Sequence, residues 1–151
     1  MRNVFTQLYL HCVWATWNRM PLLVSRVEQG VYAAILAKCA ELQCEPLAVG
    51  GMQDHVHLLV RFPAALAVAT LMKEVKGATS HLVTHEIVPQ AFFKWQGSYG
   101  AFTVSKDAVP HVEAYIRQQR EHHARGSLVA VWEETVTDEG SSRRRPTLRP
   151  S

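Results

Sequence analysis

Two histidines one residue apart are the first feature of this sequence with the chemistry of a metal site. His55 and His57 lie in the largely apolar run DHVHLLVR at residues 54–61. In an extended strand, successive side chains point to opposite faces, so both imidazoles project from one face while Val56 and Leu58 project from the other. A single His-x-His pair is a weak indication, because it is also compatible with two half-exposed strand histidines that bind nothing.

A second polar group lies in a later segment with helical periodicity. Tyr115 and Gln119 are four residues apart, so on a helix they lie one turn apart on the same face. Core packing of the tyrosine and solvation of the amide is the alternative. The same segment contains further polar side chains, namely His111, Arg117, Arg120, His122 and His123. The sequence leaves open whether one of these histidines replaces or supplements Gln119 at a metal.

Two imidazoles and a neutral amide oxygen form a mixed donor set with coordination positions left open. Such a set suits Mg²⁺ or Mn²⁺ better than a structural zinc ion, and such a cation polarises phosphate groups. Tyrosine, with a reference pKa of about 10, is a nucleophile once its proton is removed. An activated Tyr115 could displace a sugar oxygen of a nucleic acid and keep the phosphate as a phosphotyrosine. Rejoining would then need no nucleotide cofactor, in agreement with the absence of P-loop and dinucleotide-binding glycine motifs from the sequence.

The composition favours one compact domain. The chain has 151 residues, 48% hydrophobic, and a formal net charge of +3, which permits a polyanionic partner without requiring one. No apolar run reaches membrane-spanning length and no secretory signal is present, so we expect a cytoplasmic protein without membrane contact. The three cysteines form no C-x-x-C pair, which predicts reduced, partly buried thiols. Residues 1–125 are predicted to form a catalytic domain and residues 126–151 a basic, flexible tail.

Alternating apolar residues predict the strands that position the histidines. Residues 5–14 form a first strand, and residues 53–61 form the histidine strand. Leu47 and Val49 belong to its hairpin partner, with the turn at the glycine pair 50–51. A further strand is predicted at residues 101–104.

Helical periodicity predicts the elements between these strands. A first helix covers residues 26–42 and begins with a capping-box pattern at residues 25–28. A second helix follows Pro63. Gly77 lies inside it and predicts close packing or an approaching ligand there.

The elements follow the order strand, helix, strand, strand, helix, strand, helix. The first six match the ferredoxin-like (RRM-like) βαββαβ arrangement of the α+β class, in which the first and third strands are the central pair of an antiparallel sheet. The third strand carries the two histidines. The additional C-terminal helix, which carries the tyrosine, could then cover them.

Five segments, in this order, resemble those of a known family. They are WATWNRMPL (14–22), DHVHLL (54–59), LMKEVKGATS (71–80), WQGSYGAFTVS (95–105) and YIRQQ (115–119). The sequence thus resembles the HUH-type single-tyrosine transposases of the two-hundred-type bacterial insertion sequences and their REP-associated tyrosine transposase relatives. The resemblance runs from Tyr9 to His123. The sequence departs from the family pattern at Gln53, where many relatives have proline, and in its arginine-rich tail.

The resemblance implies a role for each site residue. His55, His57 and Gln119 would bind Mg²⁺ or Mn²⁺, and Tyr115 would form a 5′-phosphotyrosine and free a 3′-OH. The implied activity is that of a DNA transposase, which cleaves single-stranded DNA, transfers strands and recognises hairpins at the ends of its element. The resemblance also implies a homodimer in which the tyrosine helix of one subunit may enter the site of the other, so placement in cis or in trans stays open.

Basic side chains are the candidates for gripping the hairpin, through salt-sensitive phosphate contacts. They are Lys73, Lys76, Lys94, Arg117 and Arg120, and the two on the second helix are expected to face outward. Trp95 and Tyr99 could stack on bases, although core packing is the more natural role for each.

Three alternatives compete with transposition. A replication-initiator or relaxase-type HUH endonuclease shares the histidine pair but commonly has lysine in its tyrosine motif, where this chain has Gln119. A zinc protease is disfavoured because Leu82 occupies the place of the catalytic glutamate between His81 and His85. A non-catalytic ferredoxin-like nucleic-acid-binding module would present aromatic residues on its sheet instead of paired histidines.

Overall fold

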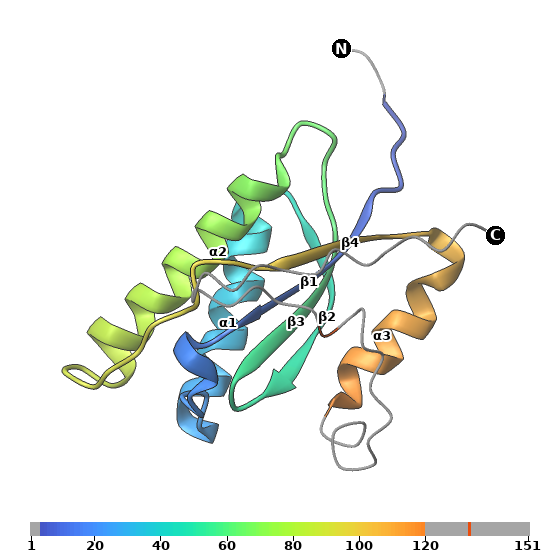
Figure 1. The fold of residues 1–151 in the computed structure, drawn as a ribbon. Coiled ribbons are helices and arrows are strands. Elements are labelled where there is room, and N and C mark those ends of the chain that lie inside the picture. Colours follow the sequence, from blue (N-terminus) through green and yellow to red (C-terminus); the bar gives the residue numbers. More distant parts are fainter. Residues whose placement is uncertain (1–3, 120–132, 134–151) are drawn as a thin grey trace, which may run out of the picture.

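A four-stranded antiparallel sheet forms the centre of the computed structural model, which describes residues 4–119 and Glu133 (Figure 1). The strands are β1 (Tyr9–Ala15), β2 (Glu45–Met52), β3 (His55–Arg61) and β4 (Gly100–Val104). Their order in the sheet is β2-β3-β1-β4. The first and third strands are therefore central, which confirms the predicted ferredoxin-like arrangement.

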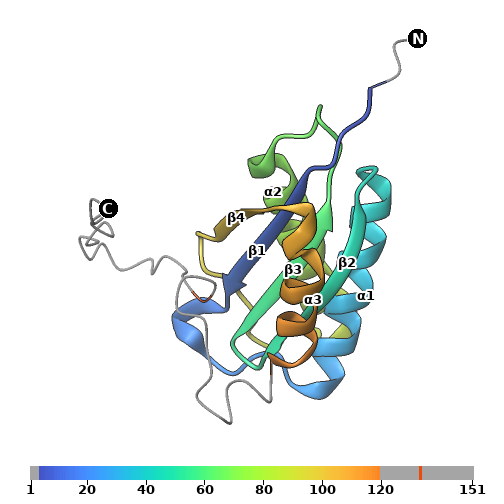
Figure 2. The ribbon, with the colours of Figure 1, turned by 90° about the vertical axis from the view of Figure 1, so that its right-hand side faces the viewer.

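Helices cover both faces of the sheet. α1 (Ser25–Glu41) and α2 (Val68–Leu82) lie on one face, and α3 (Val109–Arg117) lies on the other (Figures 1 and 2). Pro110 falls in the first turn of α3, where its missing N–H costs no helical hydrogen bond. Within the described residues, none of the helices has the length and apolar character needed to cross a bilayer.

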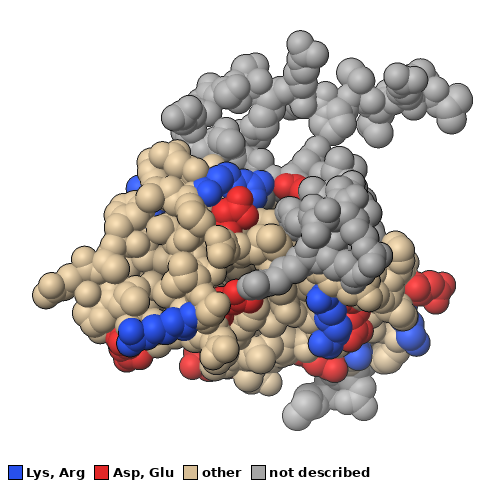
Figure 3. All heavy atoms as spheres, turned by 90° about the horizontal axis from the view of Figure 1, so that it is seen from below, with Lys and Arg blue, Asp and Glu red and all other residues tan. Residues whose placement is uncertain are grey.

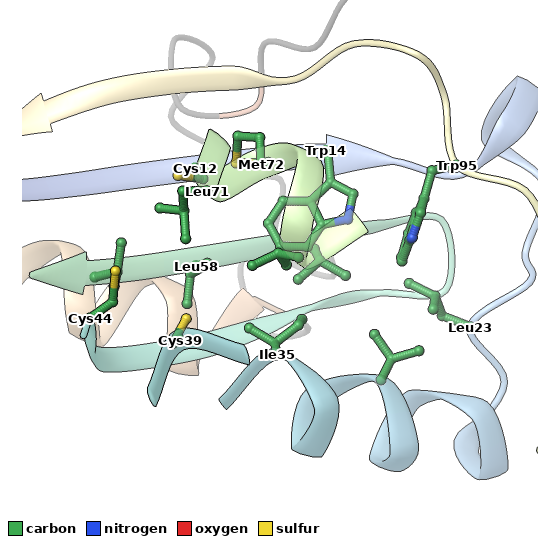
Figure 4. Close-up of a cluster of buried hydrophobic side chains, with 14 of the residues drawn as sticks. Cys12, Trp14, Leu23, Ile35, Cys39, Cys44, Leu58, Leu71, Met72 and Trp95 are labelled. Atoms are coloured by element: carbon green, nitrogen blue, oxygen red, sulfur yellow. The ribbon is translucent and has the colours of Figure 1, made fainter. Parts of the chain in front are cut away.

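The period-two alternation of the central strands separates a dry core from a polar face. Cys12 and Trp14 of β1 and Leu58 of β3 point toward α1 and α2, where they pack in the main hydrophobic core (Figure 4). The intervening side chains His11 and His57 are equally buried but point to the opposite face, toward α3. The three cysteines are free, as predicted, and are buried more fully than predicted. The apolar side chains on one face of the sheet thus stabilise the fold, and the polar side chains His11 and His57 lie on the other face.

The predicted hairpin turn is wrong. Gly50 and Gly51 lie inside β2, opposite His57 and Val56, and the turn falls at Gln53 and Asp54. A Cβ on Gly51 would clash with the backbone oxygen of His55, so glycine is needed here for close approach between strands and not for a turn. The first strand also begins later than predicted, at Tyr9.

Two helix predictions also need correction. α1 begins at Ser25 after an N-cap at Val24 that makes no side-chain capping hydrogen bond, so the capping box is not formed. Gly77 is exposed, and nothing lies within 4 Å of the position that its Cβ would take. The prediction of close packing at this glycine is therefore wrong.

Trp95 is buried in the core and donates its indole N–H to Thr79 Oγ1 (2.9 Å), which confirms the core role.

Candidate active site

The histidine pair lies in the middle of the sheet and faces α3. His55 and His57 are 1% and 0% exposed, and their ring centroids are 5.1 Å apart. Both are buried because β3 is a central strand, flanked by β1 and β2. The predicted placement of two imidazoles on one strand face is confirmed.

Tyr115 in the last turn of α3 and Gln119, two residues after the helix, lie close to the histidines; α3 ends at Arg117, so Gln119 is not on the helix as predicted. Gln119 Oε1 lies 3.2 Å from His55 Nε2, and the ring of Tyr115 lies 6.0 Å from that of His57. Val112 and Ile116, one turn apart on α3, pack on the sheet beside these polar residues. The four residues predicted to form the site therefore converge within a single chain.

Glu133 is a site residue that no pattern in the sequence predicts. Its Oε2 atom lies 3.1 Å from His57 Nε2 and 3.3 Å from His55 Nε2. Its Oε1 atom accepts hydrogen bonds from the Tyr115 hydroxyl (2.5 Å) and from Gln119 Nε2 (3.3 Å). Glu133 lies in the aperiodic segment predicted to be a tail, and no spacing relates it to the histidines. Among the described residues, its carboxylate is the common neighbour of all four predicted site residues.

The ligand atoms of His55, His57 and Glu133 lie within 4.8 Å of one another, so these three residues could hold a metal ion. Two imidazole nitrogens, a carboxylate oxygen and the nearby Gln119 amide oxygen form a donor set that fits a divalent cation with open coordination positions. The donor types also suit Zn²⁺ or Fe²⁺, so they do not by themselves select one ion. His111 is exposed on α3 and outside this group, and His122 and His123 fall outside the described residues.

Hydrogen bonds within the site raise the pKa of His55 and lower the pKa of Glu133. Burial opposes protonation of His55, but hydrogen bonds to Asp54 and Glu133 outweigh burial and raise the pKa of His55 to about 9. Burial would raise the pKa of Glu133, yet its hydrogen bonds to His55 and His57 hold this pKa far below its usual range. The site therefore contains an imidazolium–carboxylate pair, and a cation bound to His55 would require that imidazole to release its proton.

Each histidine of the pair also has a partner at its second ring nitrogen. His55 Nδ1 bonds Asp54 Oδ1 at 2.7 Å, and Arg19 lies 3.8 Å from the other carboxylate oxygen. His57 Nδ1 lies 2.8 Å from His11 Nε2. Burial, followed by the proximity of His57, lowers the pKa of His11 to about 3, so His11 is a neutral imidazole.

The residues predicted to bind DNA differ in their exposure and in the contacts that their side chains make. Lys76 is only partly buried, but its Nζ donates to the backbone oxygens of Gln96 (2.5 Å) and Ser98 (3.1 Å), so it anchors the loop before β4 and does not face outward as predicted. Lys73 is exposed on α2, on the sheet face opposite α3. Lys94 Nζ lies 3.9 Å from the ring centroid of Trp17.

Arg117 is exposed, pairs with Glu113 and donates to the backbone oxygen of Leu47, while Arg120 lies outside the described residues. On the face shown in Figure 3, basic side chains lie beside acidic ones and do not gather into one patch of described residues. The proposed DNA contacts of all five residues stay predictions.

A hollow of about 370 Å³ lies beside the site, at the free edge of β2. Tyr32 of α1, Gly51 of β2 and the segment from Arg117 to Gln119 contribute to its walls. Because Gln119 borders both the hollow and the histidine pair, a ligand in the hollow would lie next to the metal-binding group.

Comparisons with known proteins point to one family. The family model described as "Transposase IS200 like" matches residues 4–119. The ISDra2 transposase TnpA of Deinococcus radiodurans is 27% identical over 125 residues, which cover 80% of this chain and 89% of that protein. A solved structure of a Deinococcus radiodurans protein assigned as a transposase has a TM-score of 0.59 at 27% identity, with 79% and 95% of the two chains covered.

A second solved structure, a REP-associated tyrosine transposase bound to a REP hairpin, also has a TM-score of 0.59 and covers 96% of this chain and 97% of that one. Its identity is 17%, so this match shows a shared fold.

Proposed function

The chain belongs to the IS200-like transposase family, whose members cut and join DNA, and from this premise we propose that it acts on single-stranded DNA through a covalent phosphotyrosine at Tyr115. One observation supports this proposal most directly. The Tyr115 hydroxyl and both imidazoles contact the same carboxylate, that of Glu133, at 2.5 to 3.3 Å. This arrangement supports the proposal because it brings the proposed nucleophile and the proposed metal ligands around one carboxylate.

We propose that His55, His57, Gln119 and Glu133 hold Mg²⁺ or Mn²⁺. The cation would neutralise charge on the oxygens of the scissile phosphate and lower the pKa of the nearby tyrosine hydroxyl. Within Glu133, Oε2 faces the imidazoles and Oε1 faces Tyr115, so one carboxylate can be both ligand and orienting group. Because Oε1 accepts a hydrogen bond from the Tyr115 hydroxyl, we assign Glu133 the orientation of this hydroxyl.

The proposed cleavage step conserves the phosphodiester bond energy. The Tyr115 hydroxyl releases its proton to water and its Oη forms a bond to phosphorus, the bond from phosphorus to the 3′ oxygen breaks, and the leaving oxygen takes up a proton from water to become a 3′-OH. The 5′ phosphate stays on the tyrosine. Joining is the reverse reaction with the 3′-OH of another strand, so no nucleotide cofactor is consumed.

The DNA substrate is proposed to carry a hairpin, because the related structure of a REP-associated transposase holds one. We place the single strand that continues from the hairpin in the hollow at the edge of β2, where it can pass Gln119. A homodimer that exchanges the tyrosine helix between subunits is part of the same proposal.

The test uses a labelled single-stranded oligonucleotide that contains the hairpin from an end of the element. With Mg²⁺ or Mn²⁺, the wild-type protein should form an adduct that survives denaturing electrophoresis, and Zn²⁺ and Fe²⁺ are run in parallel. Tyr115→Phe removes one oxygen and should abolish the adduct while hairpin binding persists. Tyr99→Phe is the matched control and should leave the adduct unchanged.

Two results would contradict the proposal. An adduct that survives Tyr115→Phe would reject the assigned nucleophile. If His55→Ala lost hairpin affinity and cleavage equally, the histidine would have a folding role and not a metal role. Transfer of the labelled strand to a second oligonucleotide separates a joining enzyme from a nicking endonuclease or a binding module.

A further inference from the structure

His11 is a buried polar residue in direct contact with the histidine pair. It lies on β1, which pairs with β3 so that Val13 is opposite His57 and His11 is opposite Leu59. Its side chain is 0% exposed, its Nε2 is 2.8 Å from His57 Nδ1, and the two rings stack at 5.1 Å between centroids. An imidazole in this position interacts with the ring nitrogen of His57 that faces away from Glu133.

We propose that His11 is a positioning residue for the metal site, which holds His57 in the tautomer that can bind a cation through Nε2. A neutral imidazole carries one proton, and a ligating Nε2 needs that proton on Nδ1. His57 then donates Nδ1–H to His11 Nε2 across the observed 2.8 Å. The inference rests on the proposed metal site and adds to it a residue that never touches the metal or the DNA.

Histidine suits this position better than a carboxylate. Asp54 holds His55 at 2.7 Å, and an ionised carboxylate can only accept a hydrogen bond, so it fixes one direction. Glu133 Oε2 lies 3.1 Å from His57 Nε2 and attracts a proton to that nitrogen when no cation is bound. His11 Nε2 can then donate to His57 Nδ1, because an imidazole exchanges donor and acceptor roles between its tautomers.

His11 therefore accommodates both states of His57. In one state His57 donates to Glu133 and accepts from His11, and in the other it binds the cation and donates to His11. In the exchange the shared proton passes from His11 Nε2 to His57 Nδ1, His57 Nε2 releases its proton to solvent as the cation binds, and His11 takes up one proton from solvent at Nδ1, so the pair carries two protons in both states. The inference predicts that the position needs a group able both to donate and to accept at the reach of an imidazole Nε2.

The experiment compares His11→Gln with His11→Asn in the full-length protein. Both variants bury an amide of similar polarity, but only glutamine reaches about as far as the imidazole Nε2. Mn²⁺ affinity is measured without DNA, by electron paramagnetic resonance or calorimetry, and urea unfolding identifies any general loss of fold. We expect His11→Asn to weaken Mn²⁺ binding by about 10- to 100-fold, as is typical when the outer partner of a ligand histidine is lost, and His11→Gln to retain most of it.

A second readout follows the tautomer itself. The ¹⁵N chemical shifts of His57 in the Mg²⁺-saturated wild type should show a protonated Nδ1, and His11→Asn should change this signature more than His11→Gln. Equal Mn²⁺ affinity and equal ¹⁵N shifts in both variants would overturn the inference while the Tyr115 adduct still supports the function. Absence of both metal binding and adduct in the wild type would overturn the function and the inference with it.

Discussion

Replacing Gly50 by alanine should displace the helix that carries Tyr115. Gly50 lies in β2 directly opposite His57, and α3 passes over it. A Cβ at this position would lie 2.5 Å from the backbone oxygen of Ile116 and 3.3 Å from its Cγ2 atom. The first contact involves a helix backbone, which cannot rotate away as a flexible side chain can.

The size of the effect follows from this distance. Ordinary contact begins at 3.4 Å, so α3 would have to move by about 0.9 Å. Ile116 is fully buried and packs with Leu59 and Val112, which opposes such a movement. Overpacking of this kind costs about 1–3 kcal/mol of stability. A misplacement near 1 Å can also slow a catalytic step by about 100-fold, so the loss of rate should exceed what the loss of stability explains.

The assay pairs urea unfolding with the single-turnover rate of the Tyr115 adduct. Gly77→Ala is the matched control, because nothing lies within 4 Å of its Cβ position. Alanine in that exposed helical site should stabilise the protein by about 0.5–1 kcal/mol and leave the adduct rate unchanged. A Gly50→Ala protein with wild-type stability and wild-type rate would refute the seating of α3 against β2.

Three further predictions follow from the site and its surroundings. The pKa of His55 is raised from 6.5 to about 9, so the protonated imidazole stabilises the folded, metal-free protein fully below pH 6.5. This stabilisation, up to about 3 kcal/mol, is lost as pH rises through 9. Urea unfolding in EDTA across this range measures the loss, and a free energy of unfolding that does not change with pH would contradict the prediction. Glu133→Gln should reduce this pH dependence, because Asp54 alone then raises the pKa of His55, and should weaken Mn²⁺ binding; both are measurable on the same sample. Lys73→Ala should weaken hairpin binding and reduce its salt dependence without affecting unfolding, whereas Lys76→Ala should lower the unfolding free energy because it releases the loop at residues 96–98.

The order of the sheet could be predicted from the sequence because alternation and connection order constrain it. A strand with His55 and His57 at alternate positions has only one way to place both on the face away from the core. The position of the hairpin turn is predicted wrongly because a glycine pair is compatible both with a turn and with a strand that another backbone approaches closely. At Gly50 and Gly51 the absent side chains admit a helix backbone and a neighbouring strand, and neither approach is visible until the tertiary structure is known.

The convergence of Tyr115 with the histidines could be predicted because these three residues lie on regular elements with simple periods, whereas Gln119 lies two residues beyond the end of α3 and reaches the site from there. The position of His11 is partly predictable, because alternation puts it on the β1 face away from the core, beside the strand of the histidine pair. Its register against His57 depends on strand pairing, which the pattern does not specify. The role of Glu133 is not predictable from the sequence, because a carboxylate in an aperiodic segment has no periodic relation to its partners.

The two faces of the sheet also differ in how firmly they hold their helices. α1 and α2 pack through a large apolar core, whereas the buried apolar contacts of α3 come from a small cluster, Ala48, Leu59, Val112 and Ile116. The remaining attachment of α3 is polar and runs through Gln119 and Tyr115 to the histidines and Glu133. Elements with few buried apolar contacts open at lower free-energy cost than the core. We therefore expect α3 to separate from the sheet at a lower free-energy cost than α1 or α2, as the proposed access of a DNA strand to Tyr115 and the proposed exchange of the helix between two subunits would require.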